Sequence, residues 1–182
     1  MAYDAHVAVV EEAGAEFTFR DVTIDAPGPH EVLIRVKATG LCHTDLSVKA
    51  GLLPAQFPEV LGHEGAGIVE AIGSHVREFA PGDPVVMSYG SCGHCRACQE
   101  GDPAYCHEFN PLNFGGARQG KDAPIYSDGL NGAFFQQSSF GTFALAHERN
   151  VVKVPDTVDI ELLGPLGCGI QTGAGTVLNT LA

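Results

Sequence analysis

Four cysteines are spaced closely enough to hold one metal ion: Cys92, Cys95, Cys98 and Cys106. Each Cys-x-x-Cys step allows a tight turn to bring two sulfur atoms together, and four thiolates form the tetrahedral set of a structural zinc site. A pair of disulfides or an iron–sulfur cluster are the alternatives. We expect zinc, because clustered cysteines in a reducing compartment more often bind metal than form disulfides. The lobe that carries them, about residues 90–108, would stabilise the fold and take no part in chemistry.

A second metal site would draw on residues that are far apart in the chain. Cys42 and Cys168 are the only other cysteines, and His63 lies in a glycine-rich segment where backbone can pass close to a ligand. Two thiolates and one imidazole would leave zinc the open fourth position that catalysis needs. Spacing alone cannot show that the three residues meet. A buried cysteine is usually a small apolar residue, and a lone histidine is more often part of a core.

The elements that must position these residues are mostly strands. The chain has 23 glycines and 11 prolines in 182 residues, which favours many turns and few long helices. The segment 31–38 alternates and is the clearest strand. Further strands are expected at 5–10, 16–24, 61–72, 85–87, 140–146 and 150–154. Short helices are expected after residue 42, with Thr44 or Asp45 as the cap, at 160–163 and at 169–181. We predict a mainly β fold, a small barrel or distorted sandwich with short helices near its C-terminal end.

A segment of about residues 109–138 is polar and glycine-rich without a clear period. It predicts a long loop that could serve as a lid over a site. Phenylalanines in and after this segment could form a wall for an aromatic substrate, and ordinary core packing is the alternative for each of them. They are Phe109, Phe114, Phe134, Phe135, Phe140 and Phe143.

The charge balance excludes some classes of partner. Ten Lys and Arg residues against 22 Asp and Glu give a net charge of −12, opposite to the sign that nucleic-acid binding requires. No stretch has the apolar length of a membrane span, and the N-terminus lacks the pattern of a signal peptide. We therefore expect a cytoplasmic protein that binds neither nucleic acid nor membrane. A metal-binding module without catalysis is the alternative to an enzyme.

Several longer motifs resemble those of a known family. GLCHTD at 40–45, GHEGAGIVEAIG at 62–73, the four-cysteine lobe and GPLGCGIQTGAG at 164–175 follow one another as in the zinc-dependent alcohol dehydrogenases of the medium-chain dehydrogenase/reductase superfamily. The resemblance covers nearly the whole chain. NPLNFGG at 110–116, FFQQSSFGTFA at 134–144 and HERNVVKVP at 147–155 look most like the aryl-alcohol (benzyl alcohol) dehydrogenases.

The resemblance implies metal ligands at matching positions. The catalytic zinc ion would be bound by Cys42, His63 and Cys168. A structural zinc ion would be bound by Cys92, Cys95, Cys98 and Cys106, which gives two zinc ions per chain. Asp45 would orient the His63 ring, and Glu64 would lie behind the metal.

The resemblance also implies residues for proton transfer and cofactor binding. Thr44 would touch the substrate oxygen and start a proton relay, His43 would contact the cofactor phosphates, and Thr172 would lie near the nicotinamide. One position departs from better-known members, which have a histidine three residues beyond Thr44. Here it is Ser47, so the exit of the relay would need water or a cofactor hydroxyl.

The implied activity is NAD(P)-linked oxidation of a primary, aromatic alcohol to its aldehyde through a zinc-bound alkoxide, with NAD as the cofactor of a homo-oligomeric full-length enzyme. The implied fold of residues 1–182 is one GroES-like catalytic domain. The chain contains no G-x-G-x-x-G after a strand. We therefore expect the Rossmann nucleotide-binding domain to lie outside this chain, and residues 1–182 alone to be inactive.

Overall fold

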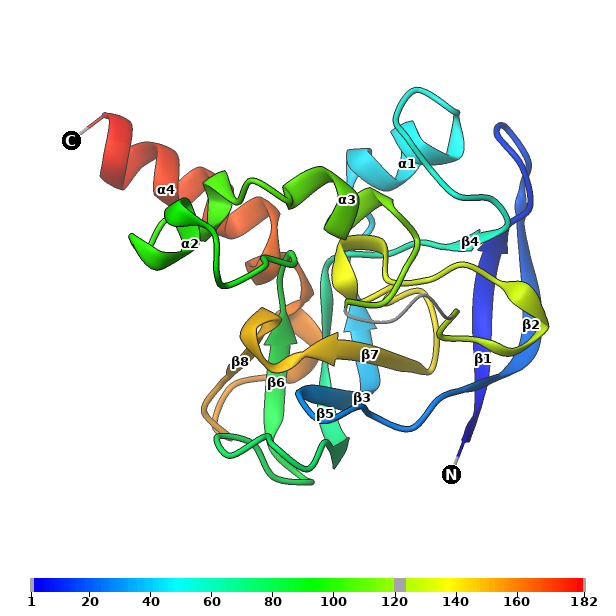
Figure 1. Ribbon diagram of the computed structural model, residues 1–182, viewed down its shortest axis with the longest axis horizontal. Coiled ribbons are helices and arrows are strands. Elements are labelled where there is room, and N and C mark those ends of the chain that lie inside the picture. Colours follow the sequence, from blue (N-terminus) through cyan, green and yellow to red (C-terminus); the bar gives the residue numbers. More distant parts are fainter. Residues whose placement is uncertain (1, 120–123, 182) are drawn as a thin grey trace.

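Two antiparallel sheets wrap around a common core in the computed structural model, which describes residues 2–119 and 124–181 (Figure 1). The three-stranded sheet has the order β2-β1-β4, and the five-stranded sheet has the order β7-β3-β5-β6-β8. The strands are β1 (Tyr3–Val10), β2 (Phe17–Ile24), β3 (Glu31–Thr39), β4 (Glu59–Val60), β5 (Gly65–Ile72), β6 (Pro84–Met87), β7 (Phe143–His147) and β8 (Val151–Lys153). The mainly β fold expected from the sequence is confirmed.

The helices are short and, apart from α1, lie late in the chain. They are α1 (His43–Lys49), α2 (Arg96–Gln99), α3 (Phe109–Phe114) and α4 (Gly169–Thr180). Short 3-10 turns lie in the connections between strands and helices: η1 (Pro103–Tyr105), η2 (Ser127–Gly129), η3 (Phe134–Gln136), η4 (Glu148–Asn150), η5 (Ile160–Leu162) and η6 (Gly164–Gly167). None of the helices in the described residues is both long and apolar enough to cross a bilayer.

The two sheets are joined where β1 meets the segment before β7. Ala8 N–H donates to Phe140 O, and Thr142 N–H donates to His6 O, both at 2.9 Å. A bridge pairs Val7 with Gly141. A Cβ at Gly141 would lie 2.8 Å from a Val7 methyl group, so this close approach requires glycine. These contacts close the strands around fully buried apolar side chains, among them Val9, Ile24, Leu33, Ile34 and Leu130.

Two predicted strand starts are wrong by three residues or more, for local reasons. The strand expected at 61–72 begins at Gly65, because Gly62 has φ of +92° and interrupts the extended chain. The strand expected at 140–146 begins at Phe143, because the preceding residues bond to β1. The segment 31–38 forms β3 as predicted, and 169–181 forms α4 to within one residue.

The expected lid segment is more ordered than its composition indicated. It includes the unpredicted helix α3, and residues 120–123 of it lie outside the described part of the chain. Asn113, Tyr126 and Leu130 in this segment are buried. Whether any part of it moves as a lid stays a prediction.

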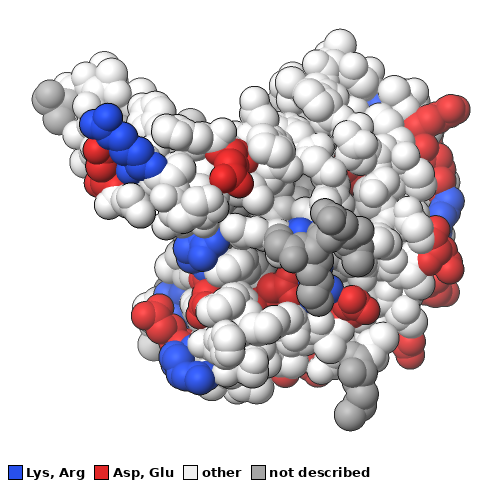
Figure 2. Space-filling model, in the orientation of Figure 1, with Lys and Arg blue, Asp and Glu red and all other residues white. Residues whose placement is uncertain are grey.

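The lobe and α4 project together from the body of the molecule. Figure 2 shows this arm as a protrusion separated from the barrel by an open notch. Most residues of α4 beyond its first turn are exposed. Acidic side chains gather along the right-hand edge of the molecule in Figure 2, near β1 and β2 (Figure 1). This is consistent with the net charge of −12.

Candidate metal centres and active site

The four cysteines of the lobe converge on one point. Their sulfur atoms all lie within 4.8 Å of one another, and the Sγ atoms of Cys92 and Cys98 are 3.9 Å apart. Two thiolates on a tetrahedral zinc ion, with bonds of about 2.3 Å, lie about 3.8 Å apart. All six cysteines of the chain are free thiols. The geometry therefore fits a metal ion and disfavours the disulfide alternative.

Backbone N–H groups point at these sulfur atoms. Cys92 N–H donates to Cys106 Sγ, and Cys95 N–H donates to Cys92 Sγ, both at 3.3 Å. Bonds from the N–H groups of Cys98 and His107 lower the pKa of Cys95 to about 6. Desolvation raises the pKa of Cys98 to about 11. The turns of the lobe thus already stabilise thiolate at one of the four positions, and thiolate is the form that binds metal.

The second set of candidate ligands also comes together. Ligand atoms of Cys42, His63, Cys168 and Glu64 lie within 4.8 Å of one another. Cys42 precedes α1, His63 precedes β5, and Cys168 precedes α4. The structure therefore brings together three residues from distant parts of the chain. Their spacing in the sequence did not show that they meet.

The His63 ring is held by a buried carboxylate. Asp45 Oδ1 lies 3.1 Å from His63 Nδ1, and the side chains are 0% and 1% exposed. A carboxylate accepts, so Nδ1 carries the proton and Nε2 presents a lone pair. Nε2 is buried and has no hydrogen-bond partner. Burial is the largest single influence and lowers the pKa of His63, but the interactions with Asp45 and Cys42 together outweigh it and the net pKa is raised. The unpartnered Nε2 beside two thiols fits a bound cation.

Asp45 also fixes the start of α1. Its Oδ2 accepts from Cys42 N–H and its Oδ1 from Gly62 N–H, both at 3.0 Å. The N-cap is Cys42, and Asp45 is the third residue of the helix, so the expectation of Thr44 or Asp45 as the cap is wrong. The first helical turn leaves N–H groups without helical partners, and a carboxylate at its third position reaches back to satisfy one. One side chain thus positions both Cys42 and His63.

Glu64 lies beside the candidate metal ligands. It is 6% exposed, and its Oε1 accepts from Gly169 N–H at 3.2 Å. A Cβ at Gly40 would lie 2.0 Å from Glu64 Oε2, so glycine makes room for the carboxylate. Burial, Cys42 and Glu64 together raise the pKa of Cys168 to about 12. A cation bound among Cys42, Glu64 and Cys168 would reduce the repulsion between their negative charges.

A cleft of about 470 Å³ opens onto His63 and Cys168. Its aromatic lining comes from Tyr89, Phe109 and Phe135. The Phe135 ring stacks on His63, with centroids 4.5 Å apart and planes at 26°. The remainder of the lining is Ala104, Gly167, Gln171, Thr172 and Asn179.

The predicted phenylalanine wall is therefore smaller than expected. Only two of the six candidate rings, Phe109 and Phe135, line this cleft. Phe134 and Phe143 are buried in the hydrophobic core, and Phe114 and Phe140 pack against it. Core packing, the alternative, holds for these four. Tyr89 lines the cleft without having been predicted.

The remaining predicted residues belong to α1 and α4, the two helices that follow Cys42 and Cys168. Thr44 Oγ1 lies 3.7 Å from Cys42 Sγ, and hydrogen bonds with Thr44 lower the pKa of Cys42 although burial opposes them. His43 is exposed at the start of α1. Thr172 lines the cleft and donates to Cys168 O at 2.8 Å. Ser47 is half-buried on the next turn of α1 from Thr44.

Comparison with known families agrees with the fold. Residues 28–156 match the model of the alcohol dehydrogenase GroES-like domain. The chain belongs to this family. The GroES-like fold implied by the sequence motifs is thereby confirmed.

Individual relatives are similar over nearly the whole GroES-like domain. Geraniol dehydrogenase from Castellaniella defragrans is 51% identical over 181 residues, which is 97% of this chain and 48% of that protein. The crystal structure of benzyl alcohol dehydrogenase from Acinetobacter calcoaceticus is 52% identical, with a TM-score of 0.94 over 98% of this chain and 49% of that one. An alcohol dehydrogenase zinc-binding domain protein from Burkholderia ambifaria is 52% identical, with a TM-score of 0.96 over 100% of this chain and 50% of that one. The chain spans about half the length of the relatives it matches.

One residue of the GroES-like domain that sequence reasoning missed is Gln137. Its side chain is fully buried. Its Nε2 donates to the carbonyl oxygens of His63 (2.9 Å) and Ser88 (3.1 Å), and its Oε1 accepts from Gly65 N–H (3.1 Å). It therefore holds the backbone on both sides of Glu64. A buried amide that serves three backbone groups carries no recognisable sequence spacing.

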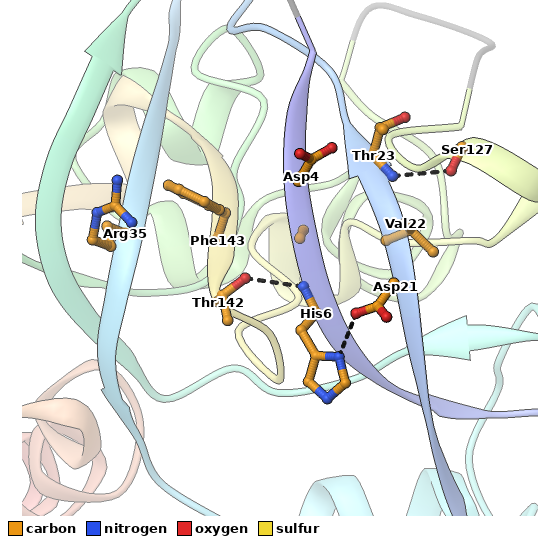
Figure 3. A pocket seen from close by; sticks show the side chains of 10 residues that line it. Asp4, His6, Asp21, Val22, Thr23, Arg35, Ser127, Thr142 and Phe143 are labelled. Carbon is orange, nitrogen blue, oxygen red and sulfur yellow. Dashed lines mark hydrogen bonds and ion pairs between the residues drawn. The ribbon is translucent and has the colours of Figure 1, made fainter.

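The chain has a second, larger hollow of about 680 Å³ between β1, β2 and β7 (Figure 3). His6, Asp21, Arg35 and Phe143 are among its lining residues. His6 Nδ1 lies 2.8 Å from Asp21 Oδ1, and Arg35 lies over the Phe143 ring at 4.7 Å. The candidate metal ligands lie elsewhere, so the smaller cleft is the candidate active site.

Proposed function

We propose that this domain is the catalytic part of a zinc-dependent alcohol dehydrogenase that oxidises a primary, aromatic alcohol to the aldehyde. The observation that carries the proposal is the buried, unpartnered Nε2 of His63 beside the thiols of Cys42 and Cys168. A buried polar atom without a partner is costly unless a ligand meets it. Two thiols and one imidazole form the donor set of a catalytic zinc site, and His63 and Cys168 of this set line the cleft.

Different residues near the cleft would bind the metal, orient its ligands and transfer the proton of the alcohol. A bound zinc ion would supply a Lewis acid that lowers the pKa of the substrate hydroxyl. Thr44 would accept the hydroxyl proton at Oγ1 and pass on its own proton. Asp45 keeps the His63 proton on Nδ1 and so leaves Nε2 free as a ligand. Ser47 takes the place of a relay histidine, so the proton would reach solvent through water.

The lining of the cleft favours an aromatic substrate. Tyr89, Phe109 and Phe135 present ring surface beside the candidate metal ligands, and aromatic rings pack well against one another in offset or edge-on geometry. One similar structure is named benzyl alcohol dehydrogenase, and a similar protein is named geraniol dehydrogenase. We infer benzyl-type alcohols as the substrate class.

Further parts of the proposal concern cofactors and assembly. A second zinc ion in the four-cysteine lobe would hold that lobe together and give two zinc ions per chain. NAD or NADP would accept the hydride, with His43 and Thr172 among its contacts. The full-length enzyme would be a cytoplasmic homo-oligomer. We also propose that residues 1–182 by themselves do not turn over alcohol, because the nicotinamide site needs residues beyond this domain.

Cobalt substitution tests the proposal on the chain as it exists. Co²⁺ in a thiolate and imidazole site absorbs visible light, and the spectrum changes when a new ligand binds. The difference spectrum between wild type and Cys168→Ala isolates the candidate catalytic site from the lobe. Benzyl alcohol should change this difference spectrum more strongly than cyclohexylmethanol does.

Two outcomes would contradict the proposal. An unchanged cobalt spectrum in Cys168→Ala would leave only a metal-binding lobe and support a module without catalysis. NAD-dependent oxidation of benzyl alcohol by residues 1–182 alone would contradict the claim that further residues are required.

A further inference from the structure

Two exposed histidine side chains meet at the end of the barrel where β5 ends and β3 begins. Figure 1 shows this end of the two strands at its lower side. His30 lies just before β3, and His75 lies in the connection between β5 and β6. Glu148 is the first residue of η4. None of these three residues lines the cleft or belongs to either group of candidate ligands described above.

The two imidazoles are spaced as ligands of one ion. His75 Nδ1 and His30 Nε2 are 3.2 Å apart. Two imidazole nitrogens bound to a tetrahedral ion by bonds of 2.0–2.1 Å lie about 3.3 Å apart. Both rings are exposed, so an ion can reach them from solvent. On metal binding, the proton on His75 Nδ1 would move to its Nε2 through solvent, and the two rings would turn so that both nitrogens face the ion.

Glu148 sets the tautomer of His30. Its Oε1 lies 2.7 Å from His30 Nδ1, so Nδ1 carries the proton and Nε2 presents its lone pair to His75. Asp45 does the same for His63 in the cleft, where Nδ1 also faces a carboxylate. A carboxylate behind a histidine ligand orients the ring and raises its basicity.

The backbone holds these segments in place independently of the side chains. His75 N–H donates to Pro29 O at 2.8 Å, and Glu148 N–H donates to His30 O at 2.9 Å. A Cβ at Gly73 would lie 1.9 Å from Gly28 O, so the two turns approach as closely as glycine allows. The pair is therefore preorganised, which reduces the entropy lost on binding a ligand.

We propose that His30 and His75 form a surface site for one divalent transition-metal ion, with water completing its coordination and Glu148 as the positioning residue. Two imidazoles suit Cu²⁺, Ni²⁺ and Zn²⁺, and Cu²⁺ binds such ligands most tightly. A metal ion at this site links the turn before β3 to the turn after β5. This site is independent of the function proposed for the cleft.

The test is a Cu²⁺ titration of the chain after its cysteine sites have been saturated with Zn²⁺. We expect one additional Cu²⁺ per chain with two coordinated nitrogens by electron paramagnetic resonance, and a rise in Tm on binding. His30→Gln and His75→Gln should each abolish this signal. Glu148→Gln should weaken binding by about 10- to 100-fold and keep two nitrogens.

His6→Gln is the matched control. His6 is also exposed and bonded to a carboxylate, that of Asp21 (Figure 3), but its ring stacks on Phe19. This variant should bind Cu²⁺ as wild type does. The proposal is overturned if wild type shows only one coordinated nitrogen, or if His30→Gln and His6→Gln bind Cu²⁺ equally. Equal Tm values for the copper-free variants show that each one is folded.

Discussion

Asp45 and His63 form a fully buried pair in which the carboxylate oxygen lies 3.1 Å from Nδ1 of the ring. The same carboxylate accepts backbone bonds from Cys42 and Gly62. Two of the three candidate zinc ligands therefore take their positions from one side chain.

Asp45→Asn is expected to weaken metal binding in the cleft by about 10- to 100-fold, because the amide cannot match the carboxylate as an acceptor for the His63 proton. Competition with a chelator of known affinity measures the change. Asp21→Asn, at the exposed pair with His6, should leave the affinity as it is. Equal affinities in Asp45→Asn and wild type would show that the pair does not serve the metal.

Cys168→Ala is expected to reduce the zinc content from about two ions per chain to about one, because only the cleft loses a ligand. Elemental analysis of the purified chain measures this. Cys106→Ala should also lose one ion, but from the lobe, with a larger fall in Tm. A zinc content that is the same in wild type and Cys168→Ala would remove this residue from the ligand set.

Glu59 is expected to make stability depend on pH. It is 0% exposed, its Oε1 has no hydrogen-bond partner, and burial raises its pKa from 4.5 to about 7. The folded state therefore holds the proton more tightly than the unfolded state does. The favourable contribution is complete below pH 4.5 and is lost as the pH rises through about 7, at a cost of about 3 kcal/mol.

Glu59→Gln should remove this dependence. Between pH 5 and pH 8, the free energy of unfolding of Glu59→Gln should increase relative to that of wild type, as measured by denaturant titrations. Glu12→Gln, at an exposed position, should show the same pH dependence as wild type. Parallel curves for Glu59→Gln and wild type would mean that Glu59 titrates alike in both states.

Phe135→Leu is expected to lower the affinity of the cobalt-loaded site for benzyl alcohol by about tenfold, because the ring that stacks on His63 also faces the cleft. The affinity for cyclohexylmethanol should change less. Spectral titration measures both. Phe19→Leu, on the exposed face of β2, is the control. An equal loss for both alcohols would assign Phe135 a purely steric role.

The features that the sequence alone predicted are those that depend on residues close together in the chain. The cysteines of the lobe lie close in the chain, so turns suffice to bring them together. The alternation of residues 31–38 predicted β3, although both faces of the strand are buried over residues 31–34 and burial alternates only from Arg35 on. Cys42, His63 and Cys168 could be joined only through the family resemblance, since their contact depends on the closure of the whole barrel.

The missed features depend on tertiary contacts. Phe135, Gln136 and Ser138 have φ of +50°, +54° and +47° although none of them is glycine. The segment therefore has no glycine that would have predicted the turn by which Phe135 comes to face His63. Packing imposes such a backbone against local preference. His30 and His75 are likewise remote in sequence and meet only because two turns are bonded together.

The junction between the barrel and α4 has a consequence for how the protein can change. A Cβ at Gly167 would lie 1.8 Å from Met87 O, and Ser88 Oγ donates to Gly167 O at 2.9 Å. The barrel thus dictates the position of the chain up to Cys168, whereas α4 beyond its first turn is largely exposed. Substitutions or truncations in the outer part of α4 should therefore leave the position of the Cys168 sulfur atom unchanged.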